Sequence, residues 1–198
     1  MDKWIHKMVD SQVKNQRIQE SEVEIYQYGY RLLFEKIGAL LLTIMIAIIF
    51  DAYWEVFFFC VAFIPLRVYT GGYHAGNALC CMILSGFALT GNIFLVRWLQ
   101  MIFNGTYFIV LELFWGILLC YFSPVETKER RITESERKYF RKMALCIFGI
   151  QVLGEIILIG MGYSRWIISF AVAHGINLIT VIFPKIKERI ITGNEVTQ

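Results

Sequence analysis

The sequence Arg67-Val-Tyr-Thr-Gly-Gly-Tyr-His-Ala-Gly-Asn-Ala-Leu-Cys-Cys81 is a polar interruption between two strongly apolar runs. It contains an arginine, two adjacent glycines, a histidine and two cysteines. A nucleophilic thiol requires a base, a donor for the developing oxyanion, and backbone that approaches the substrate closely. The segment supplies each of these residue types. Since a cysteine and a histidine near an apolar run are more often structural, the rest of the chain has to decide between the two interpretations.

The composition predicts an integral membrane protein. Of the 198 residues, 57% are hydrophobic, whereas soluble domains usually contain about 45–50%. The net charge of +3 is too small to indicate nucleic-acid binding. Five cysteines without a C-x-x-C pattern argue against a disulfide scaffold or a zinc cage, so we expect free thiols, no metal and no cofactor. With short turns and no repeat or linker, residues 1–198 are predicted to form a single domain.

Six apolar runs are each near the length of about 20 residues that crosses a bilayer. They are placed at Leu32–Phe50, Trp54–Leu66, Ala78–Val96, Tyr107–Phe122, Met143–Met161 and Trp166–Phe183. Pro65 is expected to kink or end the second run, so that Arg67 and the glycine pair are delivered to a membrane edge. The predicted fold class is therefore an all-α membrane protein with about six transmembrane helices.

Residues 1–30 are predicted to form interfacial helices ahead of the first span. Apolar residues recur at helical spacing between charged ones, which is typical of an amphipathic helix. The apolar positions are Trp4, Ile5, Met8, Val9 and Val13. Ser21 and Glu24 match a capping box, which predicts a second helix from about Glu22. A surface helix without a special role is the more frequent meaning of such a pattern, and no removable signal peptide is indicated.

The distribution of basic residues predicts the orientation. Seventeen of the nineteen Lys and Arg residues fall in segments on one side of the predicted spans, and only Arg97 and Arg165 fall on the other. Because positive charge accumulates on the cytoplasmic side, both termini, the catalytic segment 67–81 and the basic loop 123–142 are expected in the cytoplasm.

The basic loop 123–142 permits two interpretations. A proline ends the fourth run, and Thr133 with Glu136 forms a capping box that predicts a helix leading into the fifth. The positive charge is either only the orientation signal or a docking surface for an acidic peptide, to which Lys128, Arg130 and Arg131 would contribute.

Three ionisable residues fall inside predicted spans. Glu112 and Glu155 are costly there unless they face a polar cavity, and a position at the membrane interface is an equally good interpretation. Both are expected in the outer halves of their helices, away from the thiol. His174 has Asn177 one turn on, so the two are expected to form a hydrogen-bonded packing pair.

Helical geometry links His74 and Cys81. At about 100° per residue they share one face, but seven residues of helix separate them by about 10 Å along the axis, too far for a hydrogen bond. The helix must therefore break between them, and Gly76 and Asn77 are suited to the break. His74 would then fold over the first turn of the third span, where the helix N-terminus stabilises a thiolate at Cys81.

The pattern Arg67-x-x-x-Gly71-Gly72-Tyr73-His74-x-x-x-x-x-x-Cys81, with Ser123-Pro124-Val125-Glu126-Thr127-Lys128, resembles the accessory gene regulator B family. These are membrane cysteine endopeptidases of Gram-positive peptide quorum sensing. The resemblance extends over nearly the whole chain, and it implies that His74 and Cys81 are the catalytic pair. Arg67 and Gly72 match further positions that matter for activity, whereas the neighbouring Cys80 is not part of the motif.

The resemblance also implies a substrate and a product. Cys81 would cleave the acidic C-terminal tail from a short membrane-associated propeptide, and the resulting thioester would pass to a cysteine of the propeptide as a thiolactone ring. Arg67 and the amides of Gly71 and Gly72 would serve the substrate or the oxyanion. A homodimer in the bacterial cell membrane is implied as well. Two other classes stay open from the residues alone, a peptide exporter and a non-catalytic membrane assembly factor.

Overall fold

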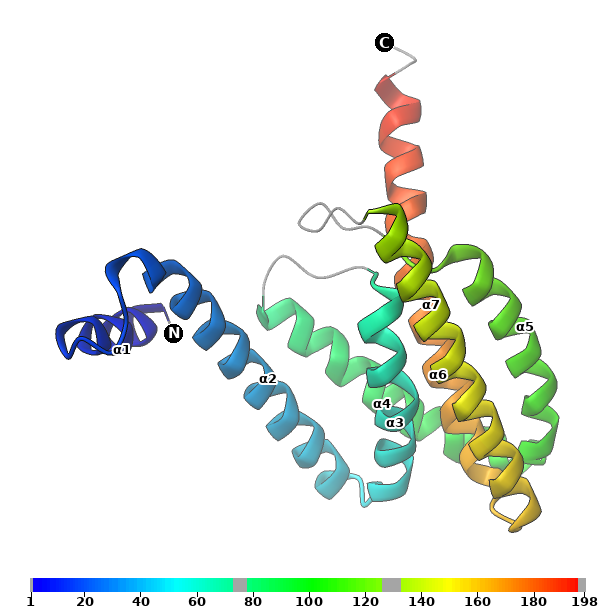
Figure 1. The fold of residues 1–198 in the computed structure, drawn as a ribbon. Coiled ribbons are helices and arrows are strands. Elements are labelled where there is room, and N and C mark those ends of the chain that lie inside the picture. Colours follow the sequence, from blue (N-terminus) through cyan, green and yellow to red (C-terminus); the bar gives the residue numbers. More distant parts are fainter. Residues whose placement is uncertain (1, 73–77, 126–132, 196–198) are drawn as a thin grey trace.

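A computed structural model describes residues 2–72, 78–125 and 133–195. The described part is built from helices joined by short turns (Figure 1). The helices are α1 (Asp2–Lys14), α2 (Val23–Ile49), α3 (Tyr53–Thr70), α4 (Ala78–Ile102), α5 (Phe108–Phe122), α6 (Glu134–Gly160) and α7 (Ile167–Glu195). From α2 onward, six are long and apolar enough to span a membrane, which confirms the predicted all-α membrane fold.

Helix α7 packs against four of the other five spans, namely α3, α4, α5 and α6. In the part of α7 that could span the membrane, 67% of the residues are buried inside the protein, against 11–33% in the other five candidate spans. It contacts α3, α5 and α4, and Figure 1 shows it behind α6 and between α3 and α5. Phe170 and Ala173 of α7 join Val56 and Phe59 of α3 in one apolar core. Leu178 contributes to a second core nearer the other end of the bundle.

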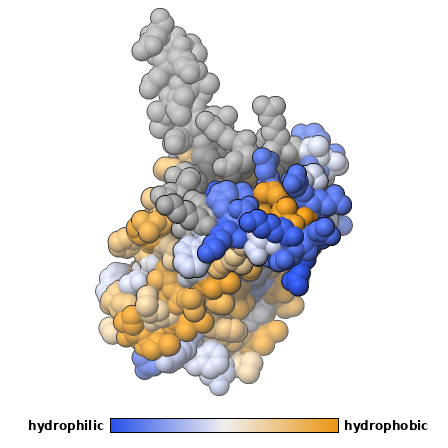
Figure 2. Space-filling model, turned by 90° about the vertical axis from the view of Figure 1, so that its left-hand side faces the viewer, coloured by the Kyte–Doolittle hydropathy of each residue, from blue (hydrophilic) through white to orange (hydrophobic). Residues whose placement is uncertain are grey.

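The outer surface of the bundle is apolar over a broad band. Figure 2 shows a hydrophobic belt with hydrophilic residues above and below it. Leu40, Phe57, Ile117 and Ile150 are among the large side chains exposed on the spans. Because lipid tails are as apolar as these side chains, the belt is where the protein meets the bilayer.

Pro65 does not end α3, which continues to Thr70. A proline inside a helix cannot donate to the carbonyl four residues earlier, here that of Val61. Gln151 of α6 replaces this donor, since its Nε2 donates to the carbonyl oxygens of Val61 and Ala62 at 2.9 and 3.0 Å. Of the two expected outcomes, a kink or an end, the end is therefore excluded, because α3 continues past Pro65 and a neighbouring span satisfies the backbone.

The helix cap in the N-terminal region differs from the predicted capping box of Ser21 and Glu24. The capping box is formed by Gln19 and Glu22 ahead of a 3-10 turn, and α2 begins at Val23. The amphipathic helix α1 is confirmed, and it buries Ile5 and Val9 while lying against α2. At the other predicted box the structure agrees with the sequence, since Thr133 and Glu136 cap α6.

Candidate functional site

The predicted site lies at the end of the bundle where α3 and α5 end and α4 and α6 begin (Figure 1). Two segments far apart in the sequence pair there through their backbones. Gly71 forms a parallel bridge with Val125, and the Val125 N–H donates to the carbonyl oxygen of Thr70 at 3.0 Å. The segment that follows α3 is therefore fixed by the segment that follows α5. The sequence pattern placed each motif in a connection but gave no sign that they pair.

Both glycines of this segment have geometry that other residues do not tolerate. Gly71 and Gly72 have φ angles of 67° and 121°, in the region that favours glycine. A Cβ on Gly71 would lie 2.7 Å from the carbonyl oxygen of Val125, and one on Gly72 would collide with the Arg67 guanidinium. The glycine pair thus lets the backbone pass between α7 and the end of α5.

Arg67 binds across this backbone to α7. Its Nη1 donates to the carbonyl oxygen of Gly71 and, at 2.7 Å, to the hydroxyl of Thr180. The hydroxyl of Thr180 in turn donates to the carbonyl oxygen of Asn177 at 2.7 Å. Because two acceptors on different elements hold one nitrogen, the half-buried guanidinium has a defined position.

Cys81 lies in the first turns of α4, where its thiol is exposed. Helix α4 begins at Ala78, at the residue predicted from the sequence. Helix α4 packs against α3, the helix that carries Arg67. The neighbouring Cys80 is exposed as well.

The structure thus brings together three of the predicted site residues, namely Arg67, Gly71 and Gly72, and it places Cys81 in the first turns of α4. The predicted base, His74, lies outside the described residues. So do the three basic residues predicted for the docking surface, Lys128, Arg130 and Arg131. Their roles stay predictions.

One side of α7 presents polar residues that the sequence interpretation assigned wrongly. His174 and Asn177 do not bond to each other. Asn177 accepts from Thr70 at 2.9 Å and donates to the carbonyl oxygen of Phe63, whereas His174 contacts Glu112 and another span. Residues three apart on a helix point in directions about 60° apart, so each meets a different neighbour. The spacing His174, Asn177, Thr180 was the available signal for a polar stripe.

Glu112 and Glu155 are fully buried between spans, so neither carboxyl group faces lipid. Glu112 lies ten residues before the end of α5, which is about 15 Å of helix. They are therefore distant from the end that holds Arg67, as predicted, but they are interior.

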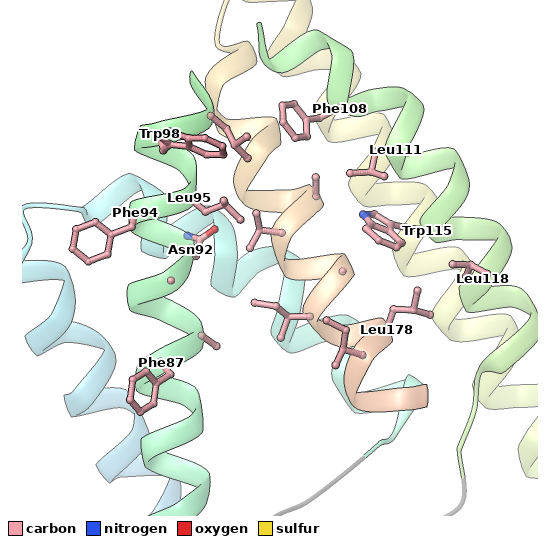
Figure 3. Close-up of a pocket in the computed structure, with 18 of the residues that line it drawn as sticks. Phe87, Asn92, Phe94, Leu95, Trp98, Phe108, Leu111, Trp115, Leu118 and Leu178 are labelled. Atoms are coloured by element: carbon pink, nitrogen blue, oxygen red, sulfur yellow. The ribbon is translucent and has the colours of Figure 1, made fainter. Parts of the chain in front are cut away.

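A large groove opens between α4 and α5, with α7 as its floor (Figure 3). It has a volume of about 880 Å³, and its lining is almost wholly apolar, including Phe87, Leu95, Trp115 and Leu178. A groove of this composition suits lipid chains or an apolar segment and offers no group for bond cleavage.

A family model for accessory gene regulator B matches residues 3–183. The chain belongs to this family. Family members are involved in processing autoinducer peptides in quorum sensing and act with a propeptide substrate. No curated protein and no solved structure matches the chain. Membership and six apolar helices together identify a multi-pass membrane protein.

We predict that Thr180 positions Arg67 for its interaction with Cys81. In a background where Cys81 is the sole cysteine, Thr180→Val should lower the rate of Cys81 alkylation several-fold because the guanidinium loses an acceptor. Thr180→Ser should restore it. The control is Thr43→Val, since that hydroxyl bonds only within α2, to the carbonyl oxygen of Ala39. Equal alkylation rates in all four proteins would contradict the assignment.

Proposed function

We propose that the protein is a membrane cysteine endopeptidase that removes the acidic C-terminal tail of an autoinducer propeptide and promotes its closure to a thiolactone. The supporting observation is the exposed Cys81 thiol in the first turns of α4, together with the Arg67 guanidinium that Gly71 and Thr180 hold at the end of α3. Family membership supports the substrate class.

The reaction begins with proton transfer from Cys81 to His74. The Cys81 sulfur attacks the carbonyl carbon at the cleavage site, and the tetrahedral intermediate collapses as His74 returns the proton to the departing amine. The tail leaves with a new N-terminus, and the remaining peptide is bound to Cys81 as a thioester. A cysteine thiolate of the propeptide then attacks that thioester, which forms the ring and releases the Cys81 thiolate. Since one thioester replaces another, ring closure requires no ATP.

Arg67 has an electrostatic role in this mechanism. Held by Gly71 and Thr180, its guanidinium is placed to donate to the substrate carboxylates or to the developing oxyanion. The N–H of Gly71 already donates to the carbonyl oxygen of Arg67, at 3.3 Å. Between the two glycines we therefore assign the oxyanion donor to Gly72, whose backbone lies beside the guanidinium.

A peptide exporter without proteolytic activity is the second candidate function. Six spans and the large apolar groove suit transport as well as they suit an enzyme. Only the enzyme requires the cluster of Arg67, Gly72 and Cys81. Cleavage of a candidate propeptide by purified protein in lipid, without ATP, is expected for the enzyme and not for the exporter or for an assembly factor.

The two adjacent cysteines should differ sharply in function. Cys81→Ser should lower cleavage by orders of magnitude because a hydroxyl is far harder to deprotonate than a thiol. His74→Ala should be comparably inactive, whereas Cys80→Ser should cost little. Intact-mass analysis should detect a hydroxylamine-sensitive acyl adduct on the Cys80→Ser protein and none on Cys81→Ser. An adduct that depends on Cys80 instead would refute the assignment.

The basic loop is proposed to bind the acidic tail of the propeptide. Reversing Lys128, Arg130 and Arg131 to Glu should weaken cleavage at an unchanged protein level, and added salt should reproduce part of the loss. The matched control is a propeptide in which the acidic residues of the tail are replaced by neutral ones. Reversing the three basic residues should have little effect on cleavage of this substrate. Unchanged cleavage of the acidic substrate would reduce the loop to an orientation signal.

Both termini and the site are proposed to face the cytoplasm. Single cysteines introduced as Asn194→Cys and Lys128→Cys should react with a membrane-impermeant maleimide only after the cells are opened. Arg165→Cys should react in intact cells, since that turn lies at the opposite end of the bundle. The reverse labelling pattern would place the site on the outside and exclude a cytoplasmic substrate.

A further inference from the structure

The buried polar cluster formed by Glu112, Gln151, Glu155 and His174 is unused by the proposed reaction. It joins α5, α6 and α7 in the interior of the bundle. Glu112, Glu155 and His174 are each 0% exposed, and one ligand atom from each lies within 4.8 Å of the others. Two carboxyl groups this close and this deeply buried repel each other when both are ionised. The cluster therefore needs positive charge or protons to exist.

The tautomer of His174 follows from its neighbour. Gln151 uses its amide nitrogen on the carbonyl oxygens of Val61 and Ala62, so its oxygen must face His174 Nε2, at 3.0 Å. An amide oxygen only accepts, which means that Nε2 carries the proton. In a neutral imidazole, Nδ1 is then unprotonated and carries a lone pair. It points at Glu112 Oε2, 2.6 Å away.

Several acceptors in the cluster have no donor. Both oxygens of Glu155 and Oε1 of Glu112 are buried without a hydrogen-bond partner in the described part of the chain. One shared proton satisfies the contact between His174 and Glu112 but leaves the Glu155 carboxylate without a hydrogen-bond donor. A divalent cation would satisfy one nitrogen and two carboxylates at once and neutralise both negative charges.

We propose that Glu112, Glu155 and His174 bind a divalent transition-metal ion that ties α5, α6 and α7 together. An imidazole nitrogen with carboxylate oxygens is a donor set that such ions accept. Gln151 orients the ring by accepting from Nε2, as partners of metal-bound histidines commonly do. Ligands at about 2.0–2.2 Å from one ion lie roughly 3 Å apart, so the three donor atoms, now within 4.8 Å of one another, would have to move by on the order of 1 Å. The site is independent of the Cys81 chemistry.

The test measures metal bound to the purified full-length protein in lipid nanodiscs after chelation and dialysis against Mn²⁺ or, separately, Co²⁺. Mn²⁺ is chosen because it prefers oxygen and imidazole ligands to the free thiols of this chain. Elemental analysis should give about one ion per wild-type chain, and the sharp spectrum of aqueous Mn²⁺ should broaden on binding.

Glu155→Gln is the decisive variant, because its carboxylate accepts no hydrogen bond whose loss would disturb folding. It should weaken binding at least about tenfold, and Glu112→Gln should do the same. Two controls should bind like wild type. They are Glu55→Gln, whose carboxylate pairs with Arg97 elsewhere, and Cys81→Ser, which removes the exposed thiol.

Two results would overturn the proposal. If neither ion binds the wild-type protein above background, the cluster is neutralised by protons. If Glu155→Gln and Glu112→Gln bind as much as wild type, or if Cys81→Ser loses binding, the ion lies elsewhere.

Discussion

A polar group inside a bilayer has to find its partner within the protein, and the α3–α7 interface is where this chain meets that constraint. Along it, Thr70 bonds to Asn177, and Arg67 bonds to Thr180. Each contact joins side chains that lipid leaves without a partner, so each specifies how the two helices align. The position of Arg67, and with it the environment of Cys81, depends on this alignment. The same hydrogen bonds therefore determine both the position of Arg67 and the packing of α3 against α7.

The proposed chemistry benefits from this rigidity. A thiolate nucleophile near neutral pH needs stabilising charge that stays in place. Gly71 and Gly72 contribute because they have no side chain. A Cβ on Gly71 would collide with the backbone of Val125, and one on Gly72 would collide with the Arg67 guanidinium. The bridge between Gly71 and Val125 joins the catalytic segment to the connection after α5.

Much of the fold was predictable because it follows from periodicity and composition. The six spans, the start of α4 at Ala78 and the cap at Thr133 all follow from local patterns. Partners across spans were not predictable, because a local pattern states which face of a helix is polar but not what lies opposite. The repair of the α3 backbone at Pro65 by Gln151 is one such case. His174 is another, since its true partners are 62 and 23 residues away in the sequence. For the site, sequence analysis named Arg67 and both glycines but missed Thr180, which holds the arginine.

The central place of α7 has a consequence for biosynthesis. The ribosome delivers this helix after the other five spans, yet it is the one with most of its surface covered by them. Until it enters the membrane, Gln151 and Glu112 lack their contact with His174, and Arg67 lacks Thr180. Contacts among the earlier helices, such as the bonds of Gln151 to the α3 backbone, do not require α7. Insertion of α7, rather than of the first span, is therefore the step at which the contacts of His174 and Thr180 can form.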